Sequence, residues 1–279
     1  MSSSSTLKRY LKNKSIIIGG ILVFIVVFCA LFAPIISPHD PYEMNPANAN
    51  QAACSVHPLG TDNLGRDLLT RIIFGARVSL QVGLVAVGFA MTIGVALGLI
   101  AGYYGGWVDM LIMRVVDIFL SFPVILLAIS FVAVLGPSTF NVMLALALVA
   151  WTQYTRVVRS SVLALKEEEF VLAAKTIGAS DIRIMTTYIL PNALAPIIVM
   201  ATLGLGTAVI SESTLSFLGL GIRPPMASWG NTLTFGLRFI REAPHLSTFP
   251  GLAIMLTVLG FNLLGNGIRD VTDPKLSRN

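Results

Sequence analysis

Glu212 is the residue whose type and position most suggest chemistry. It follows directly on a run of 28 uncharged residues, Ile184–Ser211. If that run lies in a membrane, a carboxylate that faces lipid costs several kcal/mol, so an acid at this position is a functional candidate. Two roles are open. The carboxylate either contacts a cationic group that passes along the protein, or it forms a salt bridge or hydrogen bond to a neighbouring subunit. We favour the second role.

The other chemically versatile residues form no catalytic set. Three scattered histidines, His39, His57 and His245, do not make the cluster with acids that a membrane enzyme needs. Cys54 and His57 have C-x-x-H spacing, but two ligands are too few for a closed zinc site, so an ordinary loop is the better interpretation. The glycines of segment 59–77 are not followed by Gly-Lys-Ser/Thr, which excludes a phosphate-binding loop. We expect no catalytic residue, no metal and no bound cofactor in this chain.

The elements that hold these residues follow from the distribution of charge. Of 279 residues, 55% are hydrophobic and only 12% are charged, whereas soluble domains are about 25% charged. Five stretches of 25, 31, 38, 28 and 26 residues contain no Asp, Glu, Lys or Arg; they are Ser15–His39, Val78–Val108, Ile118–Thr155, Ile184–Ser211 and Ala243–Ile268. About 20 helical residues cross a hydrocarbon core. The chain is therefore predicted to be a polytopic membrane protein, and a soluble enzyme is excluded.

Six membrane-spanning helices are predicted. The longest uncharged stretch contains Gly136-Pro137-Ser138, a turn signal that divides it into two spans. The predicted spans are Ile16–Ile36, Leu80–Gly102, Leu111–Leu135, Phe140–Val157, Ala193–Leu215 and Phe249–Ile268. Strands of a membrane barrel would alternate apolar and polar residues over about ten positions, and these runs do not alternate. The predicted class is all-α.

The orientation follows from lysine and arginine. With a cytoplasmic N-terminus, 13 of the 19 Lys and Arg residues fall in cytoplasmic segments and 6 outside, in agreement with the positive-inside rule. Both termini are therefore predicted to be cytoplasmic. The net charge of +5 is attributed to this topology and not to nucleic-acid binding. The first span is predicted to be a retained anchor, because its apolar core of about 22 residues exceeds the roughly 7–15 of a cleaved signal.

The external loop 37–77 is predicted to end in a short helix at the outer surface. Thr61 or Asp62 would cap this helix, and Leu64, Leu68 and Ile72 recur at helical spacing.

The cytoplasmic segment 166–191 is predicted to form two short amphipathic helices. Phe170, Ala173, Ala174 and Ile177, at i, i+3, i+4 and i+7, predict one apolar stripe on the first helix. Gly178 would end this helix in a left-handed turn.

Ser180 would cap the second helix, with Ile182, Met185 and Ile189 on one face, and Pro191 would end it. Two interpretations stay open: both apolar faces pack beneath the membrane helices, or part of the segment docks into a groove on a soluble partner.

This segment resembles the cytoplasmic loop of binding-protein-dependent ATP-binding cassette (ABC) importer permeases. Their pattern is Glu-Ala-Ala, three residues, Gly, nine residues, Ile-x-Leu-Pro, and Leu172 and Tyr188 depart from it at the glutamate and isoleucine positions. The resemblance implies an ATPase-coupling loop that contains Glu169, Phe170, Ala173, Ala174, Gly178, Ala179, Leu190 and Pro191.

Longer blocks resemble the C-type permease of dipeptide, oligopeptide and nickel importers. These blocks are His57–Asp67, Phe74–Leu80, Leu215–Gly221 with Ser228-Trp229-Gly230, and Gly267–Asp270 with Asp273-Pro274. The resemblance covers nearly the whole chain.

The resemblance implies a non-catalytic permease subunit with the transmembrane domain of a type I ABC importer, in the bacterial inner membrane. The implied regions are a tail, first helix and external loop (1–75), a five-helix domain (76–268) and a cytoplasmic tail (269–279). The implied partners are a second homologous permease, two ATP-binding subunits that bind and hydrolyse ATP, and an external solute-binding protein.

The expected cargo is di- or oligopeptides, and Glu212 is a candidate for the translocation pathway, where it would meet a peptide's α-ammonium group. The alternatives are import of nickel or another small solute by the same machinery and, less favoured, a stand-alone carrier. A carrier would need more buried acids and bases, or an inverted repeat with broken helices.

Overall fold

The computed structural model describes residues 9–10 and 12–272, and within these ranges it contains helices and no strand. The all-α prediction is confirmed. The helices are α2 (Lys14–Ile36), α3 (Leu68–Tyr104), α4 (Gly106–Leu120), α5 (Val124–Leu135), α6 (Thr139–Leu165), α7 (Glu169–Thr176), α8 (Asp181–Arg183), α9 (Leu190–Phe217), α10 (Trp229–Arg238) and α11 (His245–Thr272). A short 3₁₀ turn covers Pro46–Asn48, and a π-helical turn covers Ile184–Ile189.

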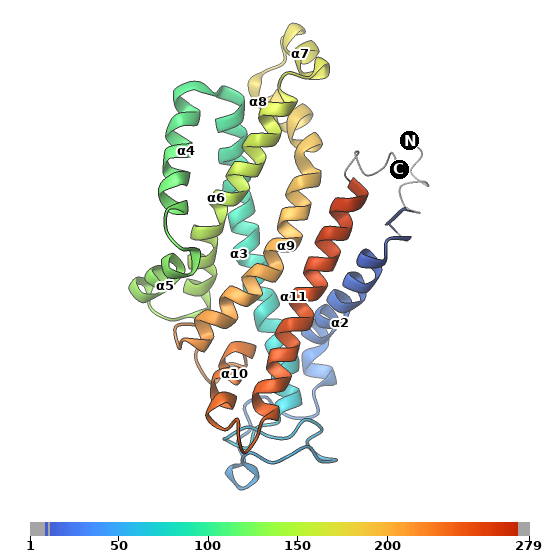
Figure 1. Ribbon diagram of the computed structural model, residues 1–279, viewed down its shortest axis with the longest axis vertical. Coiled ribbons are helices and arrows are strands. Elements are labelled where there is room, and N and C mark those ends of the chain that lie inside the picture. Colours follow the sequence, from blue (N-terminus) through green and yellow to red (C-terminus); the bar gives the residue numbers. More distant parts are fainter. Residues whose placement is uncertain (1–8, 11, 273–279) are drawn as a thin grey trace.

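The long helices α2, α3, α6, α9 and α11 run along one another and form an elongated bundle (Figure 1). One end of this bundle, here called the loop end, carries segment 37–67 and α10. The opposite end, here called the elbow end, carries α7 and α8, and the start of α2 and the end of α11 also lie there. Segment 37–67 and the helices α7 and α8 therefore lie at opposite ends of the bundle.

A ridge of glycines holds α3 and α6 together at the centre of the bundle. Gly94, Gly98 and Gly102 recur every fourth residue, so they lie on one face of α3. A Cβ atom on Gly98 or Gly102 would lie 2.7 Å from the Cβ of Val158 or Val162 in α6. Only glycine lets the two backbones approach this closely, as small residues do in membrane helix pairs.

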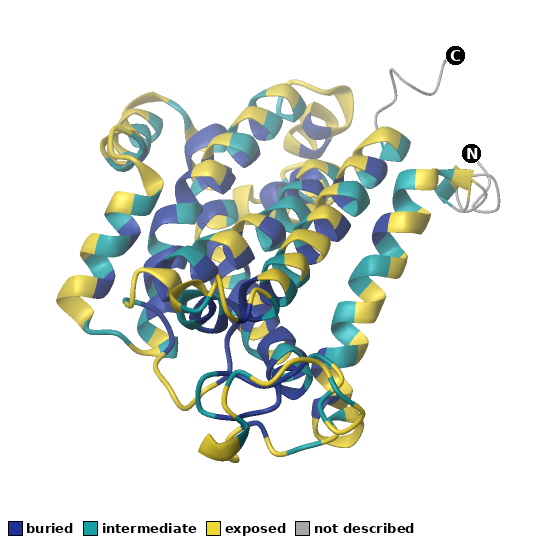
Figure 2. Ribbon diagram, turned by 60° about the horizontal axis from the view of Figure 1, so that its bottom comes forward, coloured by how far each residue is buried: buried dark blue, intermediate teal, exposed yellow. Residues whose placement is uncertain are grey.

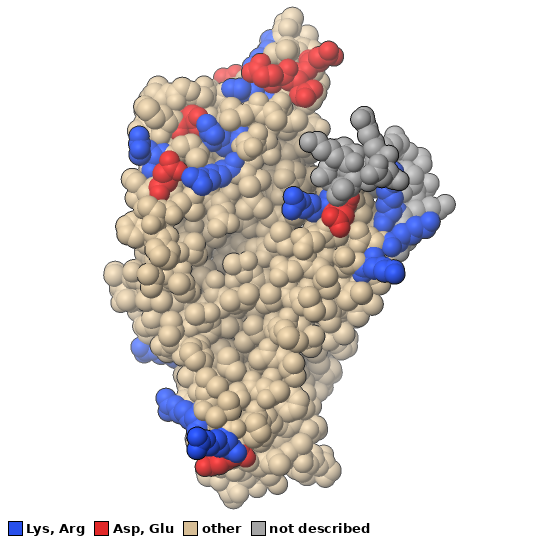
Figure 3. Space-filling view, viewed as in Figure 1, with Lys and Arg blue, Asp and Glu red and all other residues tan. Residues whose placement is uncertain are grey.

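The surface of the bundle suits a membrane. On the face that Figure 3 shows, charged side chains gather at the two ends and leave an uncharged band between them. Figure 2 shows buried residues toward the interior of the bundle and exposed residues on its outward faces. On α2 those exposed residues include Phe24, Leu31 and Ile35, at 67%, 69% and 77% exposure. Such large apolar side chains are stable against hydrocarbon and not against water.

Within the part of the chain that the structure describes, four helices are long and apolar enough to cross a membrane: α2, α3, the continuous helix Asp181–Phe217 and α11. The pair α4 and α5 makes a fifth span if the two are taken as one. The count of six spans and the cytoplasmic position of both termini stay predictions. So do the predicted domain boundaries, which fall inside α3 and α11.

The predicted span Leu111–Leu135 is not one straight helix. It breaks after Leu120, and the axes of α4 and α5 meet at 88°. Pro123 occupies the position before α5. Proline has no N–H to give to the preceding turn and disfavours a helical residue before it, so the chain turns here.

The short surface helix predicted near residue 61 is also wrong. Helix α3 begins at Leu68 and runs without a break to Tyr104. Its N-cap is Asp67, whose Oδ2 accepts a 2.8 Å hydrogen bond from the backbone N–H of Thr70. Asp62 is used to fold the preceding loop, because its Oδ1 accepts from the backbone N–H of Leu64 and of Arg66, at 2.9 and 3.0 Å.

Candidate docking elbow and the buried Glu212

The first helix of the elbow, α7, packs one side against the bundle. Val171 and Ala174 are 0% and 2% exposed. They belong to an apolar cluster whose other buried members come from α3, α6, the π turn and α9: Leu99, Val158, Val162, Ile184, Met185, Ile189, Ala193 and Ile197. Residues one helical turn apart face the same way, so this packing sets the rotation of α7 about its axis.

The surface of α7 next to this contact is apolar and uncovered. Phe170 is 39% exposed and Ile177 is 78% exposed, with Ala173 exposed between them. Ile182, in α8, is a further large apolar side chain of the elbow, at 70% exposure. Exposure is uneven along the predicted stripe: Ala174 is buried against the bundle, whereas Phe170, Ala173 and Ile177 are exposed. We call Phe170, Ala173, Ile177 and Ile182 the outward face.

The turn after α7 has the predicted left-handed glycine. Gly178 has φ +78°. The N–H of Gly178 bonds to the carbonyl of Lys175, and the N–H of Ala179 bonds to the carbonyl of Ala174, both at 3.0 Å. These two bonds are those of a Schellman motif, which satisfies carbonyls at the end of a helix. Gly178 therefore ends α7 and fixes the angle at which the chain leaves it.

The second helix of the elbow differs from the prediction. Ser180 lies at the N-cap, but its side chain makes no capping hydrogen bond. Met185 and Ile189 are buried, whereas Ile182 is exposed, so these residues do not share one face.

Pro191 does not end this helix, which continues from Asp181 to Phe217. The π turn explains the difference. The N–H of Leu190 bonds to the carbonyl of Met185, five residues back. This wider turn lets a proline follow without breaking the helix. Leu190 packs at the edge of the same apolar cluster as α7.

Three residues that the sequence analysis did not single out, Tyr103, Lys175 and Asp181, fasten the elbow to α3. The Tyr103 hydroxyl donates a 2.7 Å hydrogen bond to Oδ1 of Asp181. The ammonium group of Lys175 lies 5.4 Å from the centre of the Tyr103 ring, within the range of a cation–π contact. The tyrosine thus touches both sides of the Gly178 turn. Only the tertiary fold brings residue 103 to residue 181.

Glu212 lies far from the elbow, in the part of α9 nearer the loop end, and is 0% exposed. Ser79 in α3 donates a 3.0 Å hydrogen bond to its Oε2, and Ser216 donates a 2.8 Å hydrogen bond to its Oε1. Its observed partners are therefore serines of its own chain. The predicted contact with a passing solute is untested by this arrangement.

An apolar cavity of about 230 Å³ lies beside Glu212 and is lined by α3, α5, α6 and α9. Val87, Tyr154, Met200 and Ser211 are among its lining residues. Ser211 precedes Glu212 in the chain, but the glutamate itself does not line the cavity.

Residues 94–278 match the model of the family described as "binding-protein-dependent transport system inner membrane component". The match covers both helices of the elbow and the long helices that support it. The chain belongs to this family. Residues 4–53 also match a model described as the N-terminal transmembrane domain of oligopeptide transport permease C. This family member is a multi-pass protein of the bacterial inner membrane and a permease component of an ABC transport system.

Curated relatives of this family member cover almost the whole chain. It is 52% identical to a dipeptide transport system permease of Alkalihalophilus pseudofirmus, over 96% of this chain and 88% of the relative. It is 42% identical to a glutathione transport system permease of Pectobacterium atrosepticum, over 96% and 90%. It is 41% identical to a di/tripeptide transport system permease of Pseudomonas aeruginosa, over 96% and 91%.

Proposed function

We propose that this chain is one of two homologous permease subunits of an ATP-driven importer and forms half of its translocation channel. The observation that carries the proposal is the outward face of the elbow. An exposed apolar helix face beside an acidic first turn, held by a buried inner face, has the form of a helix that docks into a groove on a partner. The occupant of this face is an ATP-binding subunit, two of which serve the complex. ATP is bound and hydrolysed there, and this chain carries out no catalysis.

The elbow transmits the ATPase's state because it is firmly attached to the bundle. Val171 and Ala174 anchor α7 to α3, α6 and α9, and Asp181 bonds to Tyr103 at the end of α3. A shift of the docked face therefore moves the helices that line the apolar cavity. Coupling of this kind needs two packed arrangements of the same helices, one inward-open and one outward-open. Glu169, Phe170, Ala173, Ala174, Gly178, Ala179, Leu190 and Pro191 are the residues assigned to this coupling loop.

The proposed cargo is di- or oligopeptides delivered to the loop end by an external solute-binding protein. The names of the relatives support this class, because a dipeptide, a di/tripeptide and glutathione are all short peptides. Import of nickel or another small solute by the same machinery is the second candidate. Glu212 remains a candidate residue of the translocation pathway, where it would contact a peptide's α-ammonium group.

Reconstitution tests the proposal. The chain, a second permease and two ATP-binding subunits are placed in liposomes with ATP inside and binding protein outside. We expect uptake of labelled dipeptide that stops without ATP or without binding protein. Nickel ions serve as the competing cargo. Uptake of dipeptide by this chain alone would show that it is a stand-alone carrier.

A further inference from the structure

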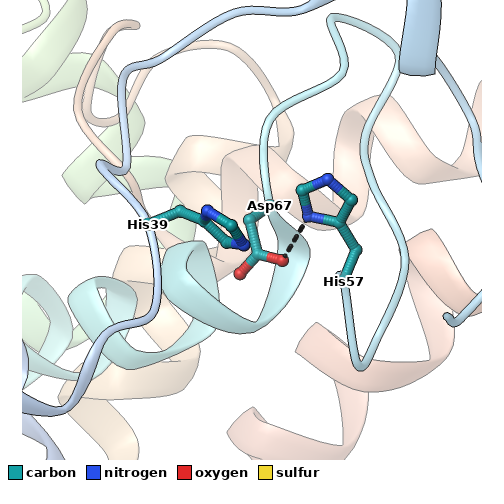
Figure 4. A group of neighbouring side chains, drawn as sticks. All are labelled: His39, His57 and Asp67. Carbon is teal, nitrogen blue, oxygen red and sulfur yellow. Dashed lines mark hydrogen bonds and ion pairs between the residues drawn. The ribbon is translucent and has the colours of Figure 1, made fainter. Parts of the chain in front are cut away.

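Three side chains with metal-binding atoms converge at the loop end of the molecule. His39 lies just after α2, His57 lies in the middle of segment 37–67, and Asp67 caps α3. Each offers one ligand atom, and these atoms lie within 4.8 Å of one another. Figure 4 shows the Asp67 carboxylate beside both imidazole rings, whose centroids are 4.7 Å apart. The residues are 10 to 28 positions apart in the chain, so only the fold of the loop brings them together.

Hydrogen bonds hold the rings in orientations that suit coordination. Nε2 of His39 lies 2.9 Å from the carbonyl oxygen of Val56. If Nε2 carries the proton, it donates to that carbonyl and leaves Nδ1 with a free lone pair. Nδ1 of His57 lies 3.0 Å from Oδ1 of Asp67. Metal-binding histidines commonly donate their second ring N–H to a carbonyl in this way, as His39 does to Val56, which orients the ring. The His57–Asp67 contact instead has the spacing of two ligand atoms, and the ion would replace the proton between them.

The surroundings of the cluster favour a cation. The cluster borders a polar hollow that is also lined by Asp40 and Glu43. Asp67 is 1% exposed and His57 is 12% exposed at the side chain, so water screens the Asp67 charge poorly.

We propose that His39, His57 and Asp67 form a binding site for a Zn²⁺-type divalent transition metal. Two imidazoles and one carboxylate are a known zinc ligand set, with water at the fourth position. Zinc–ligand distances of about 2.0–2.1 Å in tetrahedral geometry place the ligand atoms about 3.3 Å apart. Atoms that lie within 4.8 Å reach this spacing by small side-chain rotations. Cys54 is not in the set; its Sγ accepts a 3.3 Å hydrogen bond from the backbone N–H of His57.

The ion ties the two ends of the external segment together. His39 is three residues beyond α2, and Asp67 is the N-cap of α3. A ligand that binds only the folded loop stabilises it by mass action. The site therefore sets the rigidity of the surface at the loop end, whatever the transporter carries.

Zinc binding to the purified full-length chain in detergent tests the proposal without any transport assay. A chromophoric zinc chelator competes for the ion, and Mg²⁺, which prefers oxygen ligands, serves as the ion control. We expect one high-affinity Zn²⁺ per chain. His39→Gln and His57→Gln should each weaken the affinity at least about 10-fold. His245→Gln, the same change in the one histidine outside the cluster, should not.

Hydrogen exchange supplies the second measurement. Zn²⁺ should slow amide exchange in residues 37–67 of the wild-type chain, and His39→Gln should abolish this protection. Three results would overturn the proposal: equal affinity in the wild type and His39→Gln, protection confined to other segments, or an affinity that falls with Cys54→Ser and not with His39→Gln.

Discussion

The hydroxyl of Tyr103, the second-last residue of α3, donates a 2.7 Å hydrogen bond to Asp181, the first residue of α8. It is a direct polar link between a helix that crosses the bundle and the far side of the elbow turn. Tyr103→Phe removes this bond and keeps the ring beneath Lys175. A hydrogen bond of this kind contributes about 0.5–1.5 kcal/mol, so amide exchange in residues 176–183 should quicken up to roughly tenfold. Tyr104→Phe, on the adjacent exposed ring, is the control, and equal exchange in the two variants would contradict the link.

A substitution at Gly178 should be tolerated better, the more readily the new residue adopts a left-handed backbone conformation. A bulky L-residue in this conformation costs roughly 1–2 kcal/mol, and asparagine adopts it more readily than other residues. Nothing lies within 4 Å of the Cβ position, so the cost comes from the backbone alone. In the assembled transporter, ligand-stimulated ATP hydrolysis should therefore fall least for Gly178→Asn, more for Gly178→Ala and most for Gly178→Val. Equal activity for Asn and Val would refute a left-handed turn.

Ala173 and Ala174 form a matched pair, because they are neighbours with the same side chain, and Ala173 is exposed whereas Ala174 is buried. Ala174→Asp buries an unpaired charge in the apolar cluster, which costs several kcal/mol. The elbow should then become sensitive to protease in the isolated chain. Ala173→Asp leaves α7 folded but puts a charge on the outward face. Transport should fall at least about tenfold, which corresponds to roughly 1.4 kcal/mol of lost docking.

The docking proposal depends on the contrast within this pair. A protease-resistant Ala173→Asp chain that still transports fully would show that the outward face has no partner. A protease-resistant Ala174→Asp chain would show that α7 does not pack as described.

The glycine ridge makes a prediction about stability. In Gly98→Ala the new Cβ would lie 2.7 Å from Cβ of Val158 and 2.8 Å from the carbonyl oxygen of Thr155. This overpacking should destabilise the chain by about 1–3 kcal/mol. Gly88→Ala is the control on the same helix, since its Cβ would meet nothing within 4 Å. It should be neutral or stabilising by up to about 1 kcal/mol. Unfolding in mixed micelles with increasing SDS measures the stability of both variants. Similar changes in stability for Gly98→Ala and Gly88→Ala would argue against a close α3–α6 contact.

Glu212→Gln tests the two roles of the buried acid. An amide can accept a hydrogen bond at one of its two terminal atoms only, so it keeps the bond from Ser79 or the one from Ser216 and loses the other. We expect destabilisation of about 1–3 kcal/mol. The destabilisation caused by Ser216→Ala should be less than additive with that caused by Glu212→Gln, since the two residues share one hydrogen-bond network. Unchanged thermal stability with selective loss of peptide uptake would instead place Glu212 in the pathway.

Several features of this protein were readable from the sequence because their causes are local. Hydrocarbon excludes charge, so the uncharged stretches mark most of the long helices without knowledge of their neighbours. A left-handed turn needs a residue such as glycine, so Gly178 identified the end of α7. The family was recognised from a resemblance within one short segment. That segment matches the family's cytoplasmic loop at Ala173-Ala174, Gly178 and Leu190-Pro191.

Other features depended on distant residues and were decided by the tertiary structure alone. Periodicity placed Ala173 and Ala174 on one stripe, but the cluster contributed by α3, α6 and α9 decides that Ala174 is buried and Ala173 is not. Pro191 was predicted to end a helix, yet the π turn before it allows the helix to continue.

The arrangement of side chains at the loop end also depends on residues that are distant in the sequence. The sequence suggested Cys54, three residues away, as the metal-binding partner of His57, whereas the fold places His57 beside His39 and Asp67. Sequence spacing constrains contacts within a helix or turn, but the folding back of an irregular loop depends on every side chain it buries. The site at the loop end is therefore a property of the folded chain.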